Sequence, residues 1–337
     1  MTKATTPFRA LVVRECGDGT FKRSVEERRI DDLPAGEVLV RVDFSSLNYK
    51  DALSATGNRG VTKRFPHTPG IDAAGVVVDS AVPECTPGQE VVVSGYDLGM
   101  NTPGGFGRYI RVPSSWVMPK PESLTPETVM KVGTAGFTAA QCVVTLEEYG
   151  VAPDHGPVLV SGATGGVGCV AVALLKQHGY SVAVVTGKKQ EHDWLRNLGA
   201  DEFLDREQAS RGTDKMLLRE RWAGAVDTVG GQILAATVKA TRYNGAVACC
   251  GNAASGELPL SVYPFILRAV KLVGIDSAQC PMERRKEIWH RLMTGWDLGF
   301  LDSISTTISL DELSDAIERM LQGGIRGRIV VDMREEK

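Results

Sequence analysis

Residues 158–168 read VLVSGATGGVG, in which four residues of strand composition run into a cluster of glycines. An apolar stretch of helical composition follows, from Cys169 to His178. A strand, a glycine turn and a helix in this order let the backbone approach a dinucleotide's pyrophosphate, and the helix N-terminus presents N–H groups to it. The spacing Gly-x-x-Gly-Gly-x-Gly differs from the usual Gly-x-Gly-x-x-Gly. A tight turn without a ligand is therefore the alternative interpretation.

Short apolar segments recur around this stretch, separated by segments of helix length. They lie at residues 158–160, 182–185, 202–204, 224–227, 246–250 and 271–274. Six such strands predict an α/β fold with a doubly wound parallel sheet, a Rossmann domain.

The flanking regions have a different character. Before about residue 120, many short strands with Gly and Pro punctuation predict a β-rich, partly barrel-like domain. After the sheet we expect helices at 281–296 and 310–322 and a final strand at 327–332 that returns to the first domain. We therefore predict a β-rich domain of residues 1–125 and 279–337 and a dinucleotide-binding domain of residues 126–278.

Composition excludes several classes of protein. The net charge of −3 over 337 residues shows no bias toward nucleic acid or anionic membranes. The seven cysteines are scattered and form no CxxC, so neither a disulfide framework nor a zinc cluster is indicated. No apolar N-terminal run and no apolar stretch of ~18 residues is visible. We expect a cytoplasmic protein that has neither nucleic acid nor a membrane as a partner.

Several motifs occur in the order typical of one protein family. They are LNYKD at 47–51, TPGID at 68–72, GTAGFTA at 133–139, GATGGVG at 162–168, DTVG at 227–230 and PFILR at 264–268. The chain thus resembles the zinc-free medium-chain dehydrogenase/reductases. Within them it is similar to the quinone oxidoreductase-like branch whose best-defined activity is NADPH-dependent reduction of acryloyl-CoA. The resemblance implies a GroES-like catalytic domain beside the Rossmann domain, and a homodimer in which the strand near 270–274 pairs across a two-fold axis.

The end of the second Rossmann strand indicates the cofactor. A carboxylate there binds the ribose 2′-hydroxyl of NAD, but here the strand runs into Thr186, Gly187 and Lys188. A hydroxyl, a small residue and a lysine suit the 2′-phosphate of NADPH, because that group needs hydrogen-bond donors. A solvated turn lysine explains Lys188 but not the missing acid. Arg206, just past the third strand, either adds charge at the adenine side or is a surface arginine.

No metal is expected. Zinc-dependent relatives carry a cysteine near the first helix and a Gly-His-Glu after the following strand, where this chain has Asn48 and Gly70-Ile71-Asp72. The five histidines are dispersed without ligand spacing. The chemistry that remains is direct hydride transfer to a conjugated carbon, with the protein orienting the cofactor and stabilising the oxyanion.

Tyr49 is the candidate catalytic residue. By resemblance it lies against the cofactor, where its hydroxyl reaches the ribose or the substrate; a packing aromatic is the alternative role. Related enoyl-thioester reductases carry a proton-donating tyrosine in Asn-Tyr-Gly, but this chain has Asn58, Arg59 and Gly60 there. Arg59 has no proton to donate at neutral pH, so the proton donor stays open.

Further cofactor contacts follow from the fold and the resemblance together, with a purely structural role as the alternative for those outside the glycine loop. They are Gly162, Thr164, Gly165, Gly166 and Val167 in the glycine loop, Gly251 after the fifth strand, Ile275 and Ser277 after the sixth, and Arg328 near the C-terminus.

The leading hypothesis is an enzyme that reduces the 2,3 double bond of acryloyl-CoA to propionyl-CoA with NADPH. Lys63-Arg64 and Arg284-Arg285 are candidate pairs for the phosphates of CoA, although solvated faces explain both equally. The alternatives are an NADPH-dependent reductase of quinones or 2-alkenals, and a low-turnover NADPH-binding sensor. The acyl chain length and the stereochemistry of protonation stay open.

Overall fold

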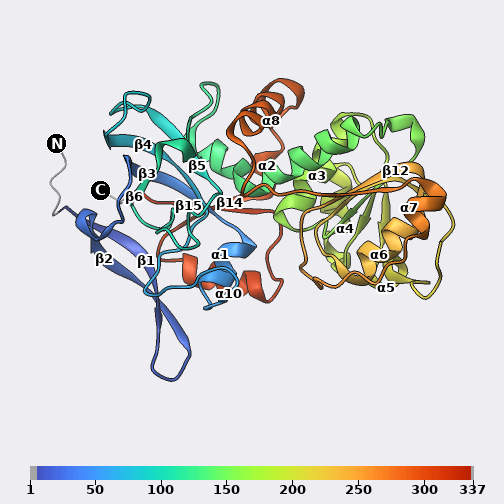
Figure 1. The fold of residues 1–337 in the computed structure, drawn as a ribbon, viewed down its shortest axis with the longest axis horizontal. Coiled ribbons are helices and arrows are strands. Elements are labelled where there is room, and N and C mark those ends of the chain that lie inside the picture. Colours follow the sequence, from blue (N-terminus) through green and yellow to red (C-terminus); the bar gives the residue numbers. More distant parts are fainter. Residues whose placement is uncertain (1–5, 335–337) are drawn as a thin grey trace. The chain divides into compact units, whose positions relative to one another are not determined.

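The computed structural model describes residues 6–334 and divides into two compact units (Figure 1). Unit 1 contains the chain up to Thr134, the short segment Ala278–Met282, and the chain from Leu301 onward. Unit 2 contains Ala135–Ser277 and Glu283–Phe300.

Unit 2 is built on a six-stranded parallel sheet with the order β10-β9-β8-β11-β12-β13. The strands are β8 (Val158–Ser161), β9 (Val182–Val185), β10 (Glu202–Leu204), β11 (Trp222–Asp227), β12 (Thr241–Cys249) and β13 (Lys271–Gly274). In sequence order this is the 3-2-1-4-5-6 arrangement of the doubly wound dinucleotide-binding fold, which confirms the predicted fold class. Strands β8, β9 and β11 are buried at every position, as expected of a parallel sheet covered on both faces.

Helices complete this unit. They are the C-terminal part of α2 (Pro126–Glu148), α3 (Gly166–Gln177), α4 (His192–Leu198), α5 (Arg206–Ser210), α6 (Gly231–Ala240), α7 (Tyr263–Arg268) and most of α8 (Met282–Gly295). On one face of the sheet, Leu159, Ala225 and Val247 pack against Leu234 and Val238 of α6. This apolar layer holds the carboxyl ends of the strands in fixed register.

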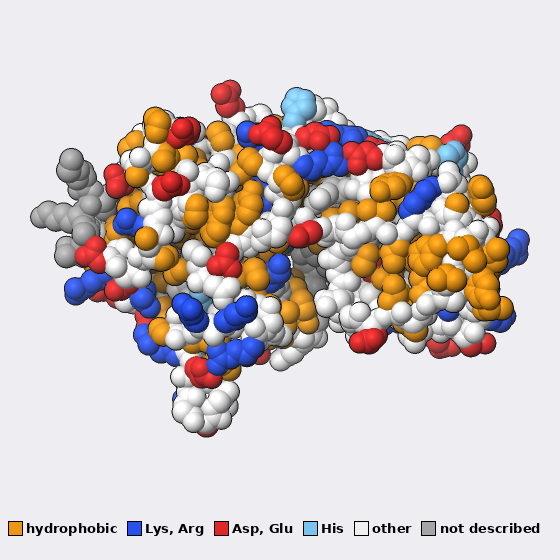
Figure 2. All heavy atoms as spheres, viewed as in Figure 1, with side chains coloured by type: hydrophobic (Ala, Val, Ile, Leu, Met, Phe, Trp, Pro, Cys, Tyr) orange, Lys and Arg blue, Asp and Glu red, His pale blue; other side chains and the backbone are white. Residues whose placement is uncertain are grey.

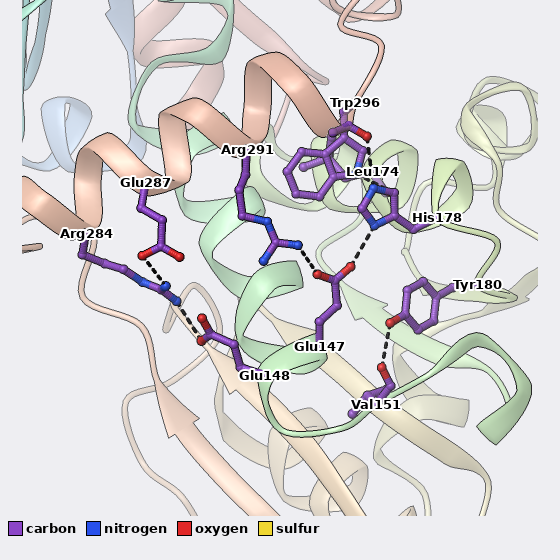
Figure 3. A network of polar contacts seen from close by, with 11 residues as sticks. Glu147, Glu148, Val151, Leu174, His178, Tyr180, Arg284, Glu287, Arg291 and Trp296 are labelled. Carbon is purple, nitrogen blue, oxygen red and sulfur yellow. Dashed lines mark hydrogen bonds and ion pairs between the residues drawn. The ribbon is translucent and has the colours of Figure 1, made fainter.

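Helix α8 belongs almost entirely to unit 2, whereas we predicted residues 279–337 to join the β-rich domain. Figure 3 shows the polar contacts that bind it to the ends of α2 and α3. Glu147 accepts a hydrogen bond from Arg291 and lies 2.8 Å from His178 Nδ1, and the His178 ring stacks on Trp296. Arg284 bridges Glu148 and Glu287 at 2.7 and 2.8 Å. Ile288, Trp289 and Leu292 of α8 are buried as well, so α8 packs through apolar and polar contacts together.

Unit 1 is β-rich. Strands β1 (Pro7–Glu15) and β2 (Phe21–Arg29) form an antiparallel pair. A second sheet has the order β14-β15-β3-β4-β5-β7, with β6 also paired to β3. Its strands are β3 (Val38–Leu47), β4 (Asp72–Ser80), β5 (Glu90–Ser94), β6 (Tyr109–Val112), β7 (Val117–Pro119), β14 (Ser305–Ser309) and β15 (Arg328–Asp332). Strand β15 pairs antiparallel with β3, so the final strand returns to the first domain as predicted.

The helices of unit 1 are short and cover the core of the second sheet. They are α1 (Tyr49–Ser54), α9 (Leu301–Ile304) and α10 (Leu313–Leu321), together with the first turns of α2. Leu313, Ala316 and Ile317 of α10 pack into the same apolar cluster as Ala52 of α1 and Val40 of β3. Helix α1 is thereby held on a rigid sheet.

Helix α2 is, by length and composition, apolar enough to cross a membrane, contrary to the expectation that no stretch of that length occurs. The most apolar 18-residue segment of α2 is 83% buried within the protein, as in the core helix of a soluble fold. The helix is also broken at Gly133, whose φ of +49° and ψ of −161° are not helical. These features favour a core element over a membrane span.

Candidate active site and cofactor site

The glycine loop after β8 is shaped by close backbone approach. Gly162 has φ +62°, and a Cβ there would lie 2.2 Å from Thr228 Oγ1, which itself donates to the Ser161 carbonyl at 2.9 Å. A Cβ at Gly168 would lie 2.4 Å from the Gly162 carbonyl oxygen. Only glycine fits both positions. Helix α3 begins at Gly166 with Gly165 as its N-cap, so the N–H groups of its first turn have no acceptor within the helix.

The carboxyl ends of the neighbouring strands β12 and β13 are also fixed by close backbone approach and by hydrogen bonds. A Cβ at Gly251, just past β12, would lie 2.4 Å from the Thr228 carbonyl oxygen. Ile275 donates its N–H to the Cys249 carbonyl at 2.9 Å. Ser277 accepts a hydrogen bond from Thr138 at 2.8 Å. These predicted contacts share the sheet edge that bears the glycine loop, which is where ligands bind in open α/β sheets.

At the tip of β9 the structure brings together Thr186, Gly187, Lys188 and Arg206. The buried Thr186 hydroxyl accepts the Lys188 N–H at 3.0 Å, and a Cβ at Gly187 would lie 3.3 Å from Arg206 Nε. Burial lowers the pKa of Lys188; Glu191 raises it and the Arg206 charge lowers it. Two cations and a small residue at a strand tip form a site suited to an anion.

Helix α1 presents Tyr49 at its first turn, with 47% of the residue exposed. The N-cap Asn48 donates its backbone N–H to Asp51 Oδ2 at 2.8 Å. The other oxygen of Asp51 accepts the backbone N–H groups of Gly70 and Ile71 at 3.1 and 2.8 Å. Asp51 is fully buried, and desolvation raises the pKa of its carboxyl to about 7 despite these donors. Asp51 thus ties the first turn of α1, which carries Tyr49, to the segment at Gly70 and Ile71.

Asp72 is the centre of a buried polar cluster behind Asn48. It accepts hydrogen bonds from Ser46 Oγ at 2.6 Å, Asn48 Nδ2 at 2.8 Å, Thr134 Oγ1 at 2.7 Å and also Ser94 Oγ. Sequence motifs contain Asn48, Asp72 and Thr134 but not Ser46 or Ser94, because the two serines lie within strands β3 and β5 and meet Asp72 only in the folded protein.

Arg328 lies in this cluster and is 2% exposed. It donates to Asn48 Oδ1 at 3.2 Å, Ser46 Oγ at 3.0 Å and the Lys131 carbonyl at 3.1 Å. A Cβ at Gly133 would lie 2.6 Å from Arg328 Nη2, so the break in α2 makes room for the guanidinium. The structure therefore gives Arg328 a role in holding Asn48, and direct contact with a cofactor stays a prediction.

The donor set at the predicted metal position does not fit zinc. Asn48 supplies an amide and Ile71 an apolar side chain, and both oxygens of Asp72 are engaged by hydroxyl and amide donors. Among residues 6–334, no group of three His, Cys, Asp or Glu side chains is arranged to hold a metal ion. No step of the chemistry proposed below passes through a metal.

Two arginines considered as ligand-binding residues from the sequence instead make contacts within the protein. The Arg59 guanidinium lies 5.5 and 5.2 Å from the ring centres of Phe21 and Phe65 and pairs with Glu15. Arg285 is buried, donates to the Ser277 carbonyl at 2.9 Å and lies over the Phe137 ring. Arg284-Arg285 thus serves the packing of unit 2.

Two family models match the chain: an alcohol dehydrogenase GroES-like domain at residues 34–122 and a zinc-binding dehydrogenase at residues 166–293. The match to the zinc-binding dehydrogenase model does not imply that this chain binds zinc, because Asn48, Ile71 and Asp72 are a poor donor set for that metal.

Three relatives align over nearly the full length. Quinone oxidoreductase YhfP of Bacillus subtilis is 42% identical over 98% of this chain and 100% of its own, and its structure with NAD bound has a TM-score of 0.93. Acrylyl-CoA reductase AcuI of Ruegeria pomeroyi is 41% identical, covering 97% of this chain and 99% of the relative. The yhdH oxidoreductase of Salmonella enterica, solved with NADP, is 42% identical over 97% of this chain and 100% of that chain, with a TM-score of 0.94.

Identity at this level over the whole length, on the same two-unit fold, shows common ancestry. The chain belongs to the medium-chain dehydrogenase/reductase family of nicotinamide-dependent oxidoreductases, in the group that contains YhfP and AcuI.

Proposed function

We propose that this protein reduces the 2,3 double bond of acryloyl-CoA with NADPH and a proton, giving propionyl-CoA and NADP⁺ by direct hydride transfer without a metal. The observation that carries the cofactor assignment is the pair Lys188 and Arg206 beside Gly187 at the tip of β9. The substrate assignment is supported by the similarity to AcuI.

The predicted cofactor contacts fit one continuous binding mode along unit 2. The glycine loop from Gly162 to Val167 receives the pyrophosphate at the N-terminus of α3. Thr186, Gly187, Lys188 and Arg206 receive the 2′-phosphate, and no carboxylate stands at the strand tip to prefer a 2′-hydroxyl. Gly251, Ile275 and Ser277 face the nicotinamide end. Because the relative YhfP has been solved with NAD bound, the affinities of this chain for NADPH and NADH should be compared directly.

NADPH, when bound, supplies the hydride that adds to C3 of the acryloyl group. Negative charge then collects on the thioester oxygen, and a proton is delivered at C2. Hydrogen-bond donors aimed at such an oxyanion are worth several kcal/mol, because they are already in place when the charge develops. The Tyr49 hydroxyl is the donor that we assign to the oxyanion or to the nicotinamide ribose.

Asn48, Asp51, Asp72 and Arg328 act as positioning residues for Tyr49. Their hydrogen bonds fix the N-terminus of α1, so the tyrosine is directed before substrate arrives. A preorganised donor costs less reorganisation than one on a mobile loop.

Lys63 and Arg64 are the cations that we assign to the phosphates of CoA. They are exposed on the loop that follows α1. That loop is tied to the helix by a 2.7 Å hydrogen bond between the hydroxyls of Ser54 and Thr62. The cations therefore lie beside the helix that carries Tyr49.

Reduction of quinones is the second candidate function, favoured by the name of the relative YhfP. One panel separates the two: kcat/KM with acryloyl-CoA, crotonyl-CoA and a benzoquinone, measured with NADPH. We expect kcat/KM to be higher for acryloyl-CoA than for crotonyl-CoA, by a factor equivalent to ~1–3 kcal/mol of transition-state binding. The reason is that the extra methyl of crotonyl-CoA lies where the hydride arrives. A benzoquinone preferred tenfold or more would overturn the acryloyl-CoA assignment.

The Tyr49→Phe variant tests the role of the hydroxyl. If it stabilises the oxyanion, kcat falls by about two to three orders of magnitude, or ~2.7–4 kcal/mol, while the fold is kept. A smaller fall with a raised KM for NADPH would assign the hydroxyl to the ribose. Unchanged kinetics would leave Tyr49 as a packing residue and contradict the proposal.

We further propose that the protein works as a homodimer in the reducing cytoplasm. All seven cysteines are free, which suits that compartment.

A further inference from the structure

A large open cavity lies at the edge of the unit 2 sheet opposite to the glycine loop. Its volume is about 580 Å³, within the range of small-molecule sites. Pro157, Glu202 and Arg221 line it, and they stand at or just before the first residues of β8, β10 and β11. The glycine loop, in contrast, follows the last residue of β8 and contributes nothing to the cavity lining. The lining approaches the cofactor edge only at Leu204, which ends β10, and at Gln208 and Ala209 of α5.

The floor of the cavity is apolar. Leu159, Leu204 and Trp222 contribute buried strand residues, and Ala236 and Ala240 contribute the last turns of α6. The alanines leave room where larger helix residues would fill the space. Such a floor receives the apolar body of a ligand.

The rim carries more positive than negative charge. Four arginines line the cavity, against two glutamates; the arginines are Arg211, Arg219, Arg221 and Arg242. Glu202 is paired with Arg221, and Glu220 with Arg268 at 3.2 Å. Arg219 is exposed, and its side chain has no partner among residues 6–334. Its guanidinium is available to a ligand at the mouth.

We propose that this cavity binds a small organic anion with an aromatic or acyl body, at a site independent of the cofactor. The body lies on the Trp222 and Leu204 floor, and the carboxylate or sulfonate pairs with Arg219. Arg221, whose guanidinium stacks 4.2 Å from the centre of the Trp222 ring, closes one side.

The test uses two probes that share a ring system and differ in charge: 8-anilinonaphthalene-1-sulfonate and uncharged N-phenyl-1-naphthylamine. Each is titrated by fluorescence into the full protein saturated with NADP⁺, which blocks the cofactor site. We expect saturable binding of one sulfonate probe per chain, tighter than that of the uncharged probe.

Two variants locate the site. Arg219→Glu should weaken the sulfonate probe about three- to tenfold, the range for reversal of an exposed charge, and leave the uncharged probe unchanged. Ala236→Trp should abolish binding of both by filling the floor. The matched control is Arg319→Glu, an exposed charge reversal in α10 of unit 1, which should change neither.

Equal affinity for both probes, or an Arg219→Glu protein that binds the sulfonate like the wild type, would overturn the proposal. Because Arg219 is on the surface, the Arg219→Glu protein should fold, and its affinity for the sulfonate probe tests the proposal even if Ala236→Trp does not fold.

Discussion

At the scale of single residues, we propose that Lys188 carries the cofactor preference. Its side chain is partly buried, and this burial lowers the pKa of the ammonium more than the nearby Arg206 charge does, so a phosphate would supply an anionic partner to a desolvated cation. Lys188→Ala should raise the dissociation constant for NADPH roughly ten- to a hundredfold, the equivalent of a charge-assisted hydrogen bond of ~1.5–3 kcal/mol. NADH, which lacks the 2′-phosphate, should be nearly unaffected. Calorimetric titration of both nucleotides checks this.

The matched control for that experiment is Lys188→Arg, which keeps the charge and should retain most of the NADPH affinity. An equal loss for NADPH and NADH in Lys188→Ala would contradict the assignment.

At the scale of elements, helix α1 is fixed by a carboxyl that is costly to ionise. Desolvation raises the folded-state pKa of Asp51 from 3.8 to about 7. Between these values the folded protein keeps a proton that the unfolded chain releases, so this contribution to stability is complete below pH ~4 and is lost as the pH rises through about 7. The free energy of unfolding should therefore decline across this window, by at most ~1.4 kcal/mol per pH unit.

Denaturant unfolding of wild type and Asp51→Asn from pH 5 to 8.5 measures this effect. The variant cannot ionise, so its stability should vary less with pH even if its absolute stability is lower. Asp154→Asn, at a carboxylate whose side chain is 87% exposed, is the control and should follow the wild type. A slope that is the same in Asp51→Asn and wild type would show that Asp51 is not the titrating group.

At the scale of the whole molecule, an apolar surface on unit 2 predicts association. Val262, Ile266 and Leu267 on and beside α7 are 63%, 67% and 57% exposed. Figure 2 shows hydrophobic side chains gathered on the part of unit 2 where Figure 1 labels α7. Strand β13 is an edge of the sheet and presents unpaired backbone groups. Contiguous apolar surface beside an open edge strand is typical of an interface.

We therefore expect a mass of twice the 36.2 kDa chain in light scattering after size exclusion. Ile266→Asp should shift the protein toward monomer, because a carboxylate would be desolvated at the interface. Met216→Asp, at a residue 60% exposed outside this surface, should leave the dimer intact. A wild-type monomer at micromolar concentration would refute the dimer.

The sequence alone determined the features that depend on neighbours along the chain. The strand of residues 158–161, the glycine loop and the helix after it follow from local composition and from the need for positive φ at Gly162. Six apolar segments separated by helix-length stretches predict the parallel sheet, because a parallel crossover needs a long connection between strands and this is usually a helix. The absence of an acid after β9 is likewise a local property, readable beside Lys188.

Only the tertiary structure decided the features that join distant residues. Asp72 meets donors from β3, β5 and α2, and Arg328 reaches Asn48 across 280 positions, because strand register and the break at Gly133 bring them together. Helix α8 packs with unit 2 through contacts to Glu147 and Glu148 that follow no periodicity. Local propensity acts over a few residues, whereas burial and hydrogen bonding in a packed core select partners irrespective of their separation, and that selection fixes Asn48 at the start of α1.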